Sequence, residues 1–146
     1  MRKIILASSS KHRKKLMRQL KISFSCVSPD IDESRKKSEP VSSFVKRLSI
    51  EKAEKIALLN KRAIVIGSDE VAVVKNKILG KPITRENAQK QLRLISDNEV
   101  NFKTGLCVID MLSKRKFSCV VNYKIGLKKL TDDIIDSYIN KEDILN

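Results

Sequence analysis

Two short polar segments of the chain combine residue types that suit phosphate chemistry. The apolar run at residues 63–66 predicts a buried strand, and the segment GSDE after it ends in Asp69 and Glu70. Ligands of open α/β sheets bind at the ends of strands. Lys81, on the next stiff turn in the segment GKP, can meet an anion held there. An acid and a lysine on neighbouring turns indicate phosphate chemistry with a metal, although a strand that merely ends in a polar turn has the same appearance.

Three serines precede a predicted helix near the start of the chain. Residues 3–7 predict a short buried strand, and residues 11–20 predict a helix that Ser10 can cap. The N–H groups at a helix N-terminus bind anions, and Ser8 and Arg13 would add donors to a phosphate. The spacing matches neither a P-loop nor a dinucleotide fingerprint, and capping alone also explains these serines.

Three acidic residues, Asp30, Asp32 and Glu33, lie close together in a predicted loop. Carboxylates at this spacing repel one another unless a cation or a basic group neutralises them. Hard oxygen ligands suit magnesium or manganese, which often bridges a protein to substrate phosphates. The loop therefore predicts a metal site, with a solvated acidic loop as the alternative.

Lys52 occupies an unusual place in the predicted long helix at residues 41–59. Apolar residues of this helix fall in one arc, and Lys52 lies near the middle of that arc, on the face that should be buried. A lysine on such a face must extend its ammonium group to solvent or find an anion. The position favours a functional lysine.

Composition limits the classes of function. Thirty-one Lys and Arg against 17 Asp and Glu give a net charge of +14, which attracts polyanions without saying which kind. Only 4% of the residues are aromatic, which argues against a protein that binds single-stranded nucleic acid by stacking its bases. Binding to a nucleic-acid backbone stays open. His12 is the only histidine, and it lies in a basic segment, which argues against a Ser-His-Asp arrangement.

The length of 146 residues favours one domain, and no apolar run approaches the length of a membrane span. Three widely spaced cysteines indicate reduced thiols and a cytoplasmic protein. Further strands are expected at residues 24–28, 63–67 and 70–75, a helix at 84–95, a long hairpin at 99–127, and a last helix from residue 131. Alternating strands and helices with antiparallel pairs predict an α/β fold with a mixed sheet.

The chain resembles the Maf-like nucleotide pyrophosphatases. The matching segments, in the order and spacing of that family, are ILASSS with Arg13, VSPDIDE at 27–33, VKRL with EKA at 45–53, IGSD at 66–69, ILGKP at 78–82 and FKTG at 102–105. The resemblance covers essentially the whole chain and is looser after residue 105. It implies a mixed sheet flanked by helices around a cleft, as in Maf and ITPase folds.

The resemblance also implies an activity and a site. Members of the family hydrolyse a nucleoside triphosphate to the monophosphate and pyrophosphate with a divalent cation, Mg or Mn. Asp69 matches the proton acceptor, and Glu33 joins it as a metal ligand. Lys52 and Lys81 match the catalytic lysines. The phosphate-binding positions correspond to Ser8 and Arg13.

Within the family, residues 20–24 and 83–93 look like the branch that hydrolyses 7-methyl-GTP. The positions tied to base choice fall at His12 and Glu70, where that branch usually has an aromatic residue and Gln. Histidine can still stack on a base, and Glu70 can pair with a cationic methylated guanine.

Residues 1–146 are expected to form a single Maf-like domain that lacks the C-terminal segment of the family and leaves a second lobe incomplete. Two alternatives stay open, a truncated relative that is inactive or binds nucleotides weakly, and a basic nucleic-acid-binding protein without activity. The expected partner is a nucleoside triphosphate, with no membrane, no specific nucleic acid, and a homodimer as an option.

Overall fold

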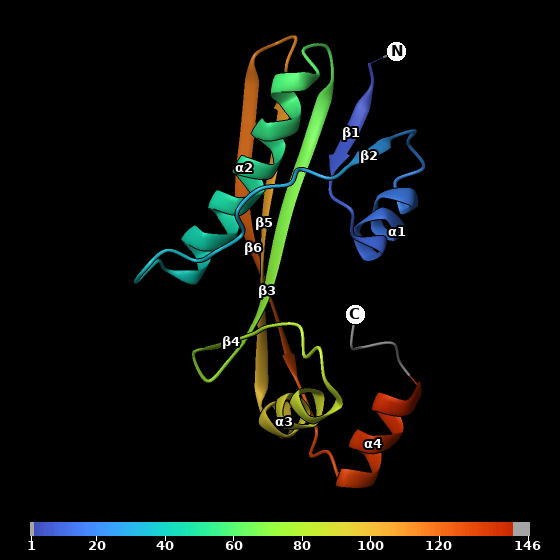
Figure 1. The fold of residues 1–146 in the computed structure, drawn as a ribbon, viewed down its shortest axis with the longest axis vertical. Coiled ribbons are helices and arrows are strands. Elements are labelled where there is room, and N and C mark those ends of the chain that lie inside the picture. The colour runs from blue at the N-terminus through green and yellow to red at the C-terminus, as the bar shows by residue number, and fades with distance from the viewer. Residues whose placement is uncertain (1, 142–146) are drawn as a thin grey trace. The chain divides into compact units, whose positions relative to one another are not determined.

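The computed structural model describes residues 2–141, in which six strands and four helices alternate (Figure 1). The first half of the chain contains β1 (Ile4–Ala7), α1 (Lys11–Gln19), β2 (Ser25–Val27), α2 (Val41–Leu59) and β3 (Ile64–Val74). The second half contains β4 (Lys77–Leu79), α3 (Arg85–Ile95), β5 (Glu99–Asp110), β6 (Arg115–Gly126) and α4 (Asp132–Lys141).

The strands form one mixed sheet in the order β2-β1-β3-β5-β6, and β4 pairs with β3. Strand β1 runs parallel to both β2 and β3, whereas β4 is antiparallel to β3. The predicted α/β class with a mixed sheet is thereby confirmed. Within the described residues, every helix is too short or too polar to cross a bilayer.

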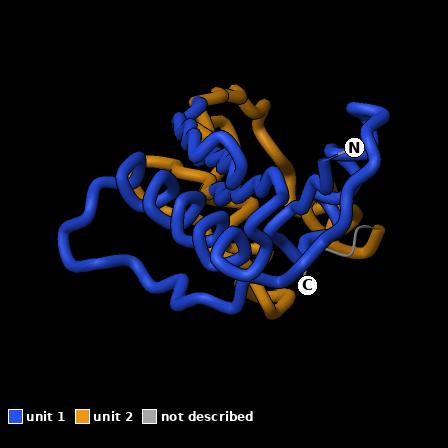
Figure 2. Tube along the Cα trace, turned by 90° about the horizontal axis from the view of Figure 1, so that it is seen from above, with its two compact units in different colours: residues 1–70, 104–121 blue, residues 71–103, 122–146 orange. Residues whose placement is uncertain are grey.

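The chain divides into two compact units, which Figure 2 distinguishes by colour. Unit 1 comprises Met1–Glu70 and Thr104–Val121, and unit 2 comprises Val71–Lys103 and Asn122–Asn146. The single domain and the cleft expected from the sequence stay predictions.

Helix α2 packs closely on the sheet of unit 1 because two glycines leave room for its backbone. A Cβ atom added to Gly67 in β3 would lie 2.2 Å from the carbonyl oxygen of Ser49, and one added to Gly105 in β5 would lie 2.1 Å from that of Val45. The core beneath the helix is made of small and branched apolar residues, including Ile5, Ala7, Ala53, Ile56, Ala57, Val65 and Cys107. The close approach brings the polar side chains of α2 and β3 within reach of each other.

We expect Gly67→Ala to destabilise the protein by about 1–3 kcal/mol, because its added methyl group would overlap the backbone of α2. Gly126→Ala is the matched control, because nothing lies within 4 Å of a Cβ atom at that position. Urea denaturation of both variants measures the difference. Equal stability of the two variants would contradict the close packing of α2.

Unit 2 is built around the contact between α3 and α4. Ala88 of α3 packs with Ile135 and Ile139 of α4, and Leu92 and Leu130 flank them. Thr84 caps α3 by accepting a hydrogen bond from the backbone N–H of Asn87, as the sequence predicts.

The sequence-based elements differ from the observed ones mainly around the GSDE segment. We expected two strands, at 63–67 and 70–75, but β3 is continuous across the acidic pair. The strand accommodates both acids because Asp69 is buried against α2 whereas Glu70 is exposed on the other face. The short strand β4 was not predicted, whereas α2 begins and ends at the expected residues.

Candidate functional site

The centre of the candidate site is the buried ammonium group of Lys52. The residue is 3% exposed although it lies on a nineteen-residue helix with an exposed face. Its Nζ donates a hydrogen bond to Asp69 Oδ1 over 2.7 Å and forms an ion pair with Glu33 Oε1 at 3.1 Å. The expectation that Lys52 lies on the buried face of its helix is confirmed, and of the two outcomes left open, its ammonium group contacts an anion.

Asp69 reaches Lys52 because of the geometry of β3. Side chains two residues apart on a strand share a face, so Asp69 points to the same side as Gly67, where α2 comes closest. Asp69 is only 6% exposed. A buried carboxylate and a buried ammonium are each costly alone, and their mutual contact removes most of that cost.

Ser8 and Arg13 lie beside Asp69, at the carboxyl end of β1. The parallel register pairs Ala7 with Gly67, so the chain that follows β1 runs next to the segment that carries Asp69. Ser8 is buried, and its Oγ accepts hydrogen bonds from the Ser10 N–H at 3.1 Å and from Arg13 Nη1 at 3.4 Å. Arg13 Nη2 lies 4.0 Å from Asp69 Oδ1. Two cationic side chains, those of Arg13 and Lys52, thus flank the Asp69 carboxylate beside the start of α1.

Ser10 acts as the N-cap of α1, as expected, by accepting a hydrogen bond from the Arg13 N–H. Ser8 is not the cap. Its hydroxyl accepts a hydrogen bond from the Arg13 side chain instead, so the capping serine and the serine at Arg13 are different residues.

The acidic loop contributes Glu33 rather than Asp32. The Asp32 carboxylate accepts hydrogen bonds from the Ser34 N–H at 2.9 Å and from the Ser34 hydroxyl at 3.0 Å. These bonds hold the pKa of Asp32 below its usual value. Glu33 is 57% exposed and its carboxylate contacts Lys52.

Glu33 and Asp69 fit the needs of a magnesium or manganese ion that also binds phosphates. Within the described residues, no three Asp, Glu, His or Cys side chains gather as a metal cage. Mg²⁺ is usually held by one or two carboxylates, with phosphates and waters completing its shell. Lys52 Nζ lies 2.7 Å from Asp69 Oδ1 and 3.1 Å from Glu33 Oε1, so one ammonium group already brings the two carboxylates together.

Three further residues were predicted for the site, two in unit 1 and one in unit 2. His12 is exposed on the first turn of α1, and Glu70 is exposed on β3, where its carboxylate accepts a hydrogen bond from the Thr104 hydroxyl. Lys81 is exposed and follows β4 in unit 2. The role of Lys81 in binding substrate phosphates stays a prediction.

Sequence reasoning missed an arginine network beside the site. The Arg47 guanidinium binds Glu39 through two hydrogen bonds, of 2.7 and 2.9 Å, and also binds Glu51. The hydrogen bond from Arg47 lowers the pKa of Glu39 to about 2. The i,i+4 spacing of Arg47 and Glu51 on a predicted helix was a usable signal for half of this network.

Two solved structures have a fold similar to that of this chain. The Staphylococcus aureus Ham1 protein matches with a TM-score of 0.58 and 16% identity, over 86% of this chain and 71% of that one. A nucleoside-triphosphatase, named dITP/XTP pyrophosphatase, from Mycobacterium abscessus matches with a TM-score of 0.50 and 17% identity, over 95% and 94%. These likenesses show the shared ITPase-like fold.

Proteins related in sequence identify the family more narrowly than the fold does. The 7-methyl-GTP pyrophosphatase of Pseudoalteromonas translucida is 42% identical over 98% of this chain and 71% of its own length. The protein of the same name from Pseudomonas aeruginosa is 42% identical over 95% and 72%. The model of the Maf-like protein family matches residues 3–146. The chain belongs to the Maf-like family, which confirms the resemblance seen in the sequence.

Proposed function

We propose that this chain is a nucleotide pyrophosphatase that hydrolyses a nucleoside triphosphate to the monophosphate and pyrophosphate. One observation carries the proposal above the rest: a lysine on the buried face of α2 contacts a buried aspartate beside an arginine and a helix start. A structural core has no need of this charge cluster, whereas a triphosphate site needs both cations and a base. The names of the sequence relatives point to the same reaction.

Each residue of the cluster has a distinct role in this proposal. Asp69 accepts a proton from the attacking water, whose oxygen bonds to phosphorus while the anhydride bond between the α- and β-phosphates breaks. Arg13 and Ser8 bind phosphate oxygens beside the start of α1. Lys52 and Lys81 stabilise the negative charge that develops on the phosphates, and pyrophosphate leaves as the second product.

A divalent cation, Mg²⁺ or Mn²⁺, is part of the proposal, with Glu33 and Asp69 as its protein ligands. When bound, it would neutralise charge on the phosphate oxygens. Lys52 contacts both of these carboxylates, so they lie close enough together to share one ion. A cytoplasmic setting and a homodimer belong to the proposal as well; the three free cysteines agree with a reducing compartment.

The proposed substrate is 7-methyl-GTP, as the names of the relatives indicate. Methylation at N7 gives guanine a positive charge, which the exposed Glu70 carboxylate can attract, and the exposed His12 ring can stack on the base. One charge-assisted hydrogen bond accounts for a preference of about tenfold over GTP.

We therefore expect kcat/KM to be about tenfold higher for 7-methyl-GTP than for GTP, and higher than for dTTP or UTP. Pyrophosphate release from the four nucleotides, measured side by side with Mg²⁺ or Mn²⁺, tests this order. Glu70→Gln should reduce the preference for 7-methyl-GTP over GTP and leave GTP hydrolysis nearly unchanged. A preference for dTTP or UTP would refute the substrate assignment.

A further inference from the structure

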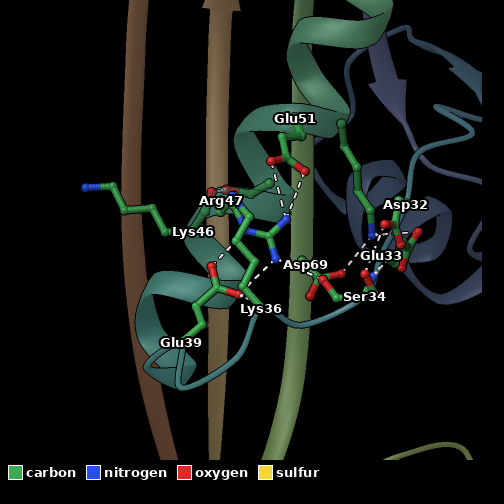
Figure 3. Close-up of polar contacts among 11 residues, drawn as sticks. Asp32, Glu33, Ser34, Lys36, Glu39, Lys46, Arg47, Glu51 and Asp69 are labelled. Atoms are coloured by element: carbon green, nitrogen blue, oxygen red, sulfur yellow. Dashed lines mark hydrogen bonds and ion pairs between the residues drawn. The ribbon is translucent and has the colours of Figure 1, made fainter.

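Arg47, on α2, contacts both ends of the 34–39 loop that follows Glu33 and also Glu51 on its own helix. Its Nε and Nη2 donate to the Glu39 carboxylate, Nη1 donates to Glu51, and Nη2 also donates to the carbonyl oxygen of Ser34 over 3.0 Å. All three guanidinium nitrogens are therefore engaged, and the side chain is only 17% exposed. The guanidinium carbon also lies 5.6 Å from the centre of the Phe44 ring, a distance typical of a cation–π contact. Figure 3 shows how these polar side chains converge.

Glu39 organises the other end of the loop. Its carboxylate also accepts a hydrogen bond from the Lys36 N–H at 3.1 Å, and its carbonyl oxygen accepts one from Arg35 Nε at 2.8 Å. Hydrogen bonds of Glu39 therefore join the two ends of the 35–39 segment, and hydrogen bonds of Arg47 attach residues 34–39 to α2. We call the contacts of Arg47 with Ser34, Glu39 and Glu51 the Arg47 clamp.

The Arg47 clamp contacts residues that are adjacent in the chain to both partners of the Lys52–Glu33 ion pair. Ser34 follows Glu33 in the chain, and Glu51 precedes Lys52. Glu33 itself is more than half exposed, and its carboxylate is held by Lys52 at 3.1 Å. Only the Lys52 end of this pair is buried, whereas both partners of the Arg47–Glu39 pair are largely shielded from solvent, so the Lys52 contact alone holds the loop less firmly. The position of Glu33 therefore depends on the backbone of Ser34, which Arg47 holds.

We propose that Arg47 is a positioning residue, which holds the 34–39 loop on α2 and so keeps the Glu33 carboxylate at Lys52 for the metal–triphosphate substrate. The catalytic part of this inference rests on the proposed function. Lysine cannot replace Arg47 here, because its single ammonium group lacks the planar fork that binds Glu39 in a bidentate manner and reaches Ser34 at the same time.

Limited proteolysis tests the hold on the loop without metal or nucleotide. Trypsin cleaves after Arg35, Lys36 and Lys37, all of which are exposed in the loop. In Arg47→Lys, which keeps the charge, we expect cleavage at these bonds to be about tenfold faster, because charge-assisted hydrogen bonds are lost. Arg93→Lys is the matched control, because it alters an exposed ion pair with Asp132 in unit 2. Equal cleavage rates in the unaltered chain and Arg47→Lys would overturn the proposal.

The effect on the site is measured by the Mg²⁺ concentration that gives half-maximal turnover. We expect Arg47→Lys to raise it about tenfold, as typical for loss of a group that orients a metal ligand. In Glu33→Gln the ligand is already impaired, so adding Arg47→Lys should cause little further increase. Independent, multiplicative effects of the two changes would show that Arg47 acts without Glu33 and would overturn the proposal. Absence of turnover in the unaltered chain would instead contradict the proposed function, while the proteolysis result would still decide whether Arg47 holds the loop.

Discussion

Replacement of Asp69 by Asn is expected to lower kcat for nucleotide hydrolysis by about 10²–10⁴-fold, because an amide cannot accept the proton of the attacking water. The change keeps the size and shape of the side chain. It also removes a negative charge from the vicinity of Lys52 and Arg13, so nucleotide binding measured without divalent cation should be unchanged or tighter. The expected signature is therefore a loss of turnover with retained affinity.

Steady-state kinetics and calorimetric nucleotide titration of the same preparation measure the two quantities. Glu54→Gln is the matched control, because it removes one carboxylate from the exposed face of α2, where Glu54 contacts Lys116. Turnover of Asp69→Asn equal to that of the control would show that Asp69 is not the proton acceptor.

Replacement of Lys52 by Met is expected to cost about 3–5 kcal/mol of the free energy of unfolding, because it leaves the buried Asp69 carboxylate without its partner. Turnover should be lost as well, since Lys52 is proposed to stabilise charge on the phosphates. Denaturation in urea, followed by circular dichroism, gives the change in stability.

Two further variants separate burial of charge from loss of packing. Lys52→Met combined with Asp69→Leu removes both charges, and we expect it to recover most of the stability, because a buried ion pair can be replaced by apolar residues at little cost. Glu33→Gln removes the exposed partner of Lys52 and should change stability by less than about 1 kcal/mol. A stable Lys52→Met variant would contradict the burial of Asp69.

Helical periodicity was enough to predict that Lys52 lies on the buried face of its helix. The apolar positions of α2 define its buried face, and a charged residue in the middle of that face requires a partner wherever the helix packs. The alternation of β3 likewise predicts that Asp69 and Glu70 point to opposite faces, which the structure confirms. These inferences need only the local geometry of one element.

Long-range contacts could not be predicted in the same way. Which acid of the 30–33 segment meets Lys52 depends on the path of an irregular loop, and that path depends on Arg47 and Glu39. No periodicity connects a loop residue such as Ser34 with Arg47 on α2. The continuity of β3 was missed for a related reason: polar residues end most strands, but here α2 neutralises Asp69 within the strand.

The identity of the products tests the central claim most directly. The purified 146-residue chain is incubated separately with 7-methyl-GTP, GTP, dTTP and UTP in the presence of Mg²⁺ or Mn²⁺, and the phosphorus-containing products are followed by ³¹P NMR. The proposed reaction produces the nucleoside monophosphate and pyrophosphate in equal amounts. Release of orthophosphate together with the diphosphate, or no hydrolysis of any of the four nucleotides tested, would contradict it.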